Sequence, residues 1–100
     1  MATTSKALAR TAAATSSATL YTVPSATTAV VTNIVVTNSA ASSATFTITL
    51  DEVDLFKDAT IAANTTAAFD LKQVLATTKI IAGFASATTI KFHISGVEIA

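Results

Sequence analysis

Residue types that commonly carry chemistry are sparse in this chain, and its single histidine, His93, is the first candidate. A nucleophilic triad needs a base held beside a nucleophile, and Lys91 and Ser95 are the same-face neighbours of His93 on a strand. Serine and threonine are so frequent in this chain that such proximity carries no information. We therefore interpret His93 as a half-exposed strand residue and predict no catalytic residue and no enzymatic activity.

Four of the six acidic residues fall in one short segment, DEVDLFKD, which raises the question of a metal site. They are Asp51, Glu52, Asp54 and Asp58. A calcium loop combines several carboxylates with a glycine that permits a sharp turn. The D-x-[DN]-x-[DN]-G pattern is missing and no glycine lies nearby. We therefore predict a solvent-facing turn at Asp51 and Glu52, with no metal and no other cofactor.

The composition argues against two further classes of partner. Six basic and six acidic residues cancel, so the basic surface expected of a nucleic-acid-binding protein is missing. No apolar run approaches the roughly 20 residues of a membrane span. With 22 alanines, 20 threonines and no net charge, little keeps copies of the chain apart. This composition suits a protein that works inside an assembly.

Two central segments predict β-structure most clearly. In Ala44–Leu50, large apolar residues alternate with threonines, so one face of a strand is apolar and the other polar. In Thr28–Asn38, β-branched apolar residues occupy both faces, which indicates a central strand covered on both sides. The small polar residues 39–43 predict that these two strands form a β-hairpin.

Shorter strands are predicted around this pair. The first is Leu20–Val23, which ends at Pro24, and the next is Val53–Lys57, which returns along the preceding strand. Residues 60–63 and 67–71 are predicted to form a second hairpin around Asn64. The last strand is 90–95, followed by a bulge or bend at Gly96, after which Val97 and Ile99 resume the alternation. Residues 74–76 fit either a strand or one helical turn, and 79–82 are predicted as a β-type run that ends at Gly83. About seven or eight short strands at this spacing predict a single antiparallel β-sandwich, of jelly-roll or immunoglobulin-like type.

The predicted core collects the large apolar residues of these strands. It consists of Leu20, Val23, Val30, Ile34, Val36, Phe46, Ile48, Leu50, Leu55, Phe69, Leu71, Leu75, Ile81, Phe84, Ile90, Phe92, Ile94 and Val97.

The N-terminal segment differs in composition from the rest. Residues 1–19 are rich in alanine, serine and threonine and contain one leucine, too little apolar surface to offset the cost of ordering them. We predict a flexible arm over 1–19 and a β-sandwich domain over 20–100. Lys6, Leu8 and Arg10 are the candidate partner-binding residues, because two cations and an apolar side chain could dock on an acidic, grooved surface. A short helix over 6–14 and a leader without contacts are the alternatives.

Four segments of the chain resemble a group of small virion proteins of tailed bacteriophages. They are LYTVP (Leu20–Pro24), TAVVTNIVVTN (Thr28–Asn38), TIAANTT (Thr60–Thr66) and SGVEI (Ser95–Ile99). Members of this group typically begin with a loose alanine- and threonine-rich leader and continue with strand segments similar to these. The resemblance spans about four fifths of the chain, and its motifs are structural.

The resemblance implies a structural virion protein of β-sandwich type, present in many copies and possibly homo-oligomeric, located in the virion and assembled in the bacterial cytoplasm. The most concrete function is a head decoration or cement protein that bridges subunits of the major capsid protein on the outer shell. A tail, neck or fibre-tip component is the first alternative, with other virion proteins as partners. A carbohydrate-binding adsorption module is the second, although one tyrosine and no tryptophan offer few rings for stacking on sugars. Neither nucleic acid nor membrane is a predicted partner.

Overall fold

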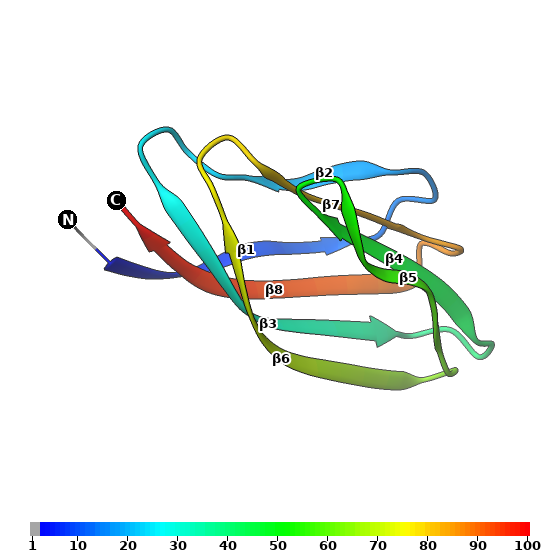
Figure 1. Cartoon of the computed structure of the whole chain (residues 1–100). Helices are drawn as coiled ribbons and strands as arrows, with labels where there is room; N and C mark the ends of the chain where they lie inside the picture. The colour runs from blue at the N-terminus through cyan, green and yellow to red at the C-terminus, as the bar shows by residue number, and fades with distance from the viewer. Residues whose placement is uncertain (1–2) are drawn as a thin grey trace.

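The computed structural model describes residues 3–100, which form eight strands in two four-stranded antiparallel sheets. The strands are β1 (Thr3–Ala12), β2 (Ala18–Thr22), β3 (Thr28–Asn38), β4 (Ala44–Leu50), β5 (Val53–Ile61), β6 (Thr65–Leu75), β7 (Ile80–Ala85) and β8 (Ile90–Ile99). Sheet A has the order β1-β8-β3-β6 and sheet B the order β2-β7-β4-β5 (Figure 1). The predicted antiparallel β-sandwich is confirmed, and this eight-stranded order, split between two packed sheets, is that of a jelly roll.

The β4–β5 hairpin forms where the sequence predicted it. Its two-residue loop is Asp51-Glu52, and both residues have positive φ, 52° and 63°. Positive φ at both central residues is typical of a type I′ turn, whose twist matches that of the two strands it connects. Asp51 and Glu52 are exposed, and Lys79 Nζ lies 3.7 Å from Asp51 Oδ1.

The other two predicted hairpins are wrong, because their strands lie in different sheets. β3 belongs to sheet A and β4 to sheet B, and β5 and β6 are likewise divided. The side chain of Asn38, only 1% exposed, holds both crossovers together. Its amide nitrogen donates to the carbonyl oxygens of Ser42, Ile61 and Ala62, and its oxygen accepts from the backbone nitrogen of Ala40. A buried amide with these bonds stabilises loops that cross between the sheets.

A bulge in β3 decides which residues reach the core. The pairing with β8 shifts between Val31 and Asn33, so the alternation changes phase along the strand. Val31 and Ile34 are both fully buried, whereas Val30 and Val35 are only half-buried. Two predictions are therefore wrong: Val30 is not in the core, and no second layer of the described chain covers the outer side of this strand.

Gly96 does not interrupt the alternation of β8, contrary to the predicted bulge. It lies between Val31 of β3 and Lys6 of β1, and it is buried. A Cβ atom at this position would lie 2.2 Å from the carbonyl oxygen of Val30, so only glycine permits this close approach. Because the alternation continues, Val97 falls on the outer face and is not in the core.

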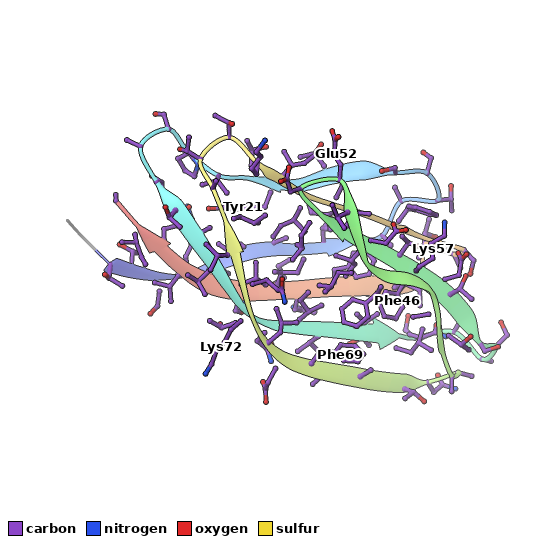
Figure 2. All side chains as sticks on the ribbon, in the orientation of Figure 1. Tyr21, Phe46, Glu52, Lys57, Phe69 and Lys72 are labelled. Carbon is purple, nitrogen blue, oxygen red and sulfur yellow. The ribbon has the colours of Figure 1, made fainter. Side chains whose placement is uncertain are left out.

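The core between the sheets includes four aromatic rings. Phe46 from sheet B contacts Phe92 of sheet A with ring centroids 6.1 Å apart, in an edge-on arrangement. Phe56 and Phe69 extend this cluster at a centroid distance of 4.6 Å. In Figure 2 the labelled rings of Phe46 and Phe69 lie in the space between the sheets. Phe84, which the sequence placed in the core, is half-buried and alternates with the buried Gly83 and Ala85.

The remaining predicted core residues divide into two groups. The fully or almost fully buried ones are Val23, Ile34, Val36, Phe46, Ile48, Leu50, Leu75, Ile81, Ile90, Phe92 and Ile94. Leu20, Leu55, Phe69 and Leu71 are partly buried and pack against them. β6 ends at Leu75, so the helical alternative for 74–76 is wrong, and β7 confirms the β-type run predicted over 79–82.

The predicted arm over 1–19 does not match the structure in its described part. Thr3–Ala12 form β1, which pairs with β8 along the edge of sheet A, and β2 begins at Ala18. Leu8 and Ala13 are buried in the core. A backbone ladder needs no large side chains, so a segment of alanine, serine and threonine can complete a sheet edge. The alternative of a short helix over 6–14 is wrong as well, because residues 6–12 belong to β1. Residues 1 and 2 lie outside the described part.

Candidate functional site

The three predicted partner-binding residues all lie on or beside the β1–β8 ladder. Leu8 occupies an irregularity in β1, where the pairing shifts between Ala7 and Ala9, and its side chain is 6% exposed. Lys6 forms an ion pair with Glu98, and Arg10 is exposed and lies opposite His93 in the ladder. Leu8 therefore belongs to the chain's own core. Within residues 3–100, Arg10 is the one of the three that is exposed and forms no ion pair with an acidic side chain.

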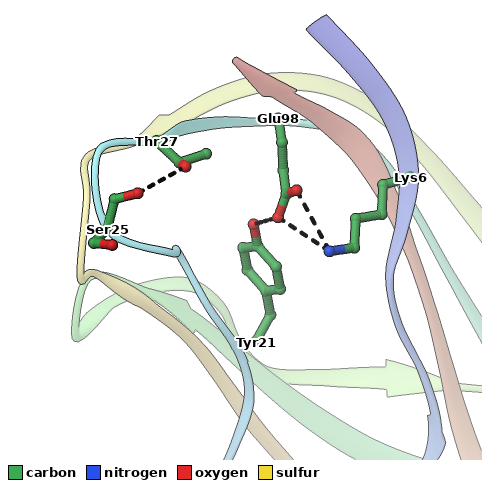
Figure 3. Close-up of polar contacts among 5 residues, drawn as sticks. All are labelled: Lys6, Tyr21, Ser25, Thr27 and Glu98. Carbon is green, nitrogen blue, oxygen red and sulfur yellow. Dashed lines mark hydrogen bonds and ion pairs between the residues drawn. The ribbon is translucent and has the colours of Figure 1, made fainter. Parts of the chain in front are cut away.

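Lys6, Glu98 and Tyr21 form one polar cluster at an end of the sandwich (Figure 3). The tyrosine hydroxyl donates to Glu98 Oε2, and Lys6 Nζ lies 3.3 Å from the same oxygen. Lys6 is on β1, Glu98 on β8 and Tyr21 on β2, so the cluster joins the edge of sheet A to sheet B. We call these three residues the clasp.

The clasp shifts the ionisation of two of its members. The hydrogen bond from Tyr21 lowers the pKa of Glu98, and Lys6 lowers it further against an opposing effect of desolvation. Burial raises the pKa of Tyr21, and its hydrogen bond to Glu98 and the charge of that carboxylate raise it further. The charged carboxylate and the neutral phenol are therefore the forms that the folded chain stabilises.

A notch at Gly96 receives Leu8 beside the clasp. A Cβ atom at Gly96 would lie 2.9 Å from Leu8 Cδ1, closer than normal van der Waals contact. The notch and the clasp together make a seat for β1 on the edge of β8, which we call the β1 seat and define by Tyr21, Gly96 and Glu98. Sequence reasoning missed these three residues, although the segments LYTVP and SGVEI contain them.

The outer face of sheet A carries an apolar patch. The pairing places Val97, Val30 and Val74 side by side on β8, β3 and β6, with Ile99 farther along β8. Val30, Val97 and Ile99 are half-buried, and Val74 is 69% exposed. No part of the described chain lies over this face (Figure 1). We call these four residues the outer patch.

The candidates for chemistry, Lys91, His93 and Ser95, share the outer face of β8, and the side-chain bonds found there do not join them. His93 lies on the outer face of sheet A between Arg10 and Val35, and Lys91 Nζ donates to Ser39 Oγ in a loop. The carbonyl oxygen of Ser95 accepts a hydrogen bond from Thr32. Within residues 3–100 no three acidic, histidine or cysteine side chains are grouped as metal ligands. The same residues contain no helix long and apolar enough to cross a membrane.

One open hollow lies at the opposite edge of sheet A from β1. It has a volume of about 460 Å³ and is lined by Thr32, Asp70, Leu71 and Lys72, where the β3–β6 pairing shifts. Lys72 points outward from this edge in Figure 2. The Asp70 carboxylate accepts a hydrogen bond from Asn33 at 3.1 Å. The hollow follows from the bulge in this ladder.

Comparison with known proteins gives limited information. No protein-family model and no curated protein matches the chain. A crystal structure of a pentameric capsid protein isolated from metagenomic phage sequences is similar at a TM-score of 0.38 and 15% identity. The alignment covers 96% of this chain, which spans 57% of the length of that protein. A likeness this weak supports no functional conclusion.

Proposed function

We propose that this protein is a structural component of a tailed-phage virion, present in many copies, and that it acts as a head decoration or cement protein without enzymatic activity. The observation that carries the proposal is the outer patch. Apolar β-branched side chains on three adjacent strands favour contact with another protein surface, because water contact with them is costly. The sequence resemblance of four segments to phage virion proteins supports the same class.

The fold is compatible with this role but does not decide it. Jelly rolls form viral capsid domains, and they also form lectins and cupins. The carbohydrate-binding alternative needs aromatic rings that sugars can reach. Tyr21 is only 9% exposed, and its hydroxyl donates a hydrogen bond to Glu98. Phe46 and Phe92 are buried in the core. The arrangement of these rings favours a protein partner over a sugar.

The proposed partner is the major capsid protein, and the proposed contact surface is the outer face of sheet A. The outer patch would pack on the shell, and Arg10 on the same face would lie near carboxylates of the shell. Arg10 remains a proposed partner-binding residue, whereas Lys6 and Leu8 act by holding β1 in place. Copies spaced over the shell would bridge adjacent capsid subunits.

Antibodies against the purified protein, applied to intact particles and viewed by electron microscopy, test the proposed location. Labels spread over the outside of the head are expected. Labels confined to the tail, neck or fibre tips would favour the alternative virion role. A protein that does not co-sediment with particles at all would overturn the proposal.

Val74→Lys tests the contact surface, with Val53→Lys on β5 of sheet B, at 68% exposed, as its matched control. Both positions are exposed, so both variants should fold like the parent. Burying a valine contributes about 1.5–3 kcal/mol, so Val74→Lys should bind particles stripped of the protein at least about tenfold more weakly. Val53→Lys should bind like the parent, because Val53 is outside the outer face of sheet A. Equal binding of both variants would exclude the outer patch as the contact.

A further inference from the structure

The way β1 is held differs from the way any interior strand is held. β1 pairs with β8 alone, and most of its side chains are exposed. Leu8 is its one large apolar side chain, and it enters the notch at Gly96. Lys6 is its one side chain that reaches an acidic partner, Glu98. The strand is thus recognised by a backbone ladder, one apolar anchor and one ion pair.

The connection between β1 and β2 would allow β1 to move as one rigid segment relative to the rest of the sandwich. Residues 15–17 are exposed and carry the chain from sheet A to sheet B. On the β1 side of them, the backbone nitrogen of Ala13 donates to Ile90 at 2.8 Å, and the Ala14 oxygen accepts from Ala85 at 2.9 Å. A change of backbone angles within 15–17 would move β1 with Ala13 and Ala14, and every contact could re-form on another copy.

We propose that the β1 seat also accepts β1 from a second copy of this chain, so that exchanged N-terminal strands link copies in the assembled form. This proposal rests on the proposed function, because a shell holds many copies close together. The occupant is a second copy because the seat matches this sequence: a leucine for the glycine notch and, two residues before it, a lysine for Glu98.

The balance between closed and exchanged forms depends on concentration. Both forms contain the same β1–β8 contacts, so the difference in free energy comes mainly from the hinge and from association. A strand tethered by a short linker has an effective concentration in the millimolar range for its own seat. A dilute chain therefore closes on itself, and copies packed on a particle reach the concentration at which exchange competes. The absence of net charge leaves no long-range repulsion between them.

Single-cysteine variants test the exchange, because the natural chain has no cysteine. Ala12 and Lys91 are paired across β1 and β8 on the outer face. One chain carrying Ala12→Cys and a second, isotope-labelled chain carrying Lys91→Cys are mixed in denaturant, refolded together at about 1 mM and oxidised. Mass spectrometry then identifies the mixed disulfide dimer.

A second mixture, Thr37→Cys with Lys91→Cys, is the matched control. These positions are also paired on the outer face, but β3 lies inside sheet A and cannot exchange as a terminal strand. We expect at least threefold more mixed dimer from the Ala12 mixture, with a yield that rises with concentration. A yield no higher than in the control at every concentration would overturn the proposal.

The double variant Ala12→Cys with Lys91→Cys verifies that the pair can be bridged within one chain. If it does not form an internal disulfide, the paired positions Arg10 and His93 replace it in the same design, with Val35 and His93 as their control. The experiment uses the free protein, so its outcome does not depend on where the protein lies on a particle. Labelling of heads without cross-linking would reject strand exchange and leave the proposed function standing.

Discussion

β1 and β8 are neighbours in one sheet, yet they are held by different means. β8 places Ile90, Phe92 and Ile94 in the core with no exposed area, and it is paired on both sides. β1 has Leu8 as its one large buried side chain and is paired on one side. Apolar burial fixes β8, whereas ladder bonds and the β1 seat hold β1. This difference separates a strand that defines the fold from one that can leave it.

Shortening one buried side chain in each strand should lower the free energy of unfolding by different amounts, and the larger loss is expected at Phe92 of β8. Phe92→Ala should lower the free energy of unfolding by about 3–5 kcal/mol, because a fully buried ring leaves a cavity. Leu8→Ala should cost about 2 kcal/mol, near the low end for leucine, since an edge strand can adjust. Denaturant titration measures both. A loss below about 1 kcal/mol for Phe92→Ala would contradict its place in the core.

A smaller effect should appear in acid, through the clasp. The folded chain lowers the pKa of Glu98, so this group stabilises the fold above its ordinary value of 4.5, and the contribution is lost as the pH falls through the lower folded-state pKa. Glu98→Gln removes that dependence and should lose less stability than the parent when the pH falls from about 5 to about 3.

Thermal melts at several pH values measure this difference, with Asp54→Asn as the control. Asp54 is an exposed carboxylate outside the clasp, so Asp54→Asn removes one carboxylate and leaves the clasp unchanged. A Glu98→Gln variant whose melting temperature falls with acid as steeply as the parent's would contradict the role of the clasp.

The same contrast shows how far the sequence predicts the structure. Alternation in Ala44–Leu50 and in 90–95 predicted strands and core residues correctly, because burial on one sheet face leaves a period of two. The eight-strand sandwich and the Asp51-Glu52 turn followed from similar local signals. The composition of residues 1–19 predicted disorder because it has few large apolar side chains, but a ladder on an edge uses backbone groups that every residue carries.

Other features depend on contacts that no local pattern contains. The bulge in β3 moved Val30 outward, and no sequence signal at Thr32 marks that change of phase. The crossovers held by Asn38 placed neighbouring strands in different sheets. The clasp joins residues separated by 77 positions, so Tyr21 and Glu98 could be paired only in three dimensions. Glycine at position 96 suggested a bulge, but this position requires glycine because the backbone of Val30 approaches it closely.

Native-state hydrogen exchange tests most directly the claim that β1 can leave a sandwich that stays folded. Amides of β3, and the β8 amides that donate to β3, should exchange only through global unfolding, with a free energy that falls steeply as denaturant is added. Amides in the β1 ladder should exchange through a local opening of lower free energy that depends little on denaturant, and Leu8→Ala should lower it further. If the β1 amides exchange with the same free energy and the same denaturant dependence as those of β3, then β1 is an inseparable part of the fold, and the account is contradicted.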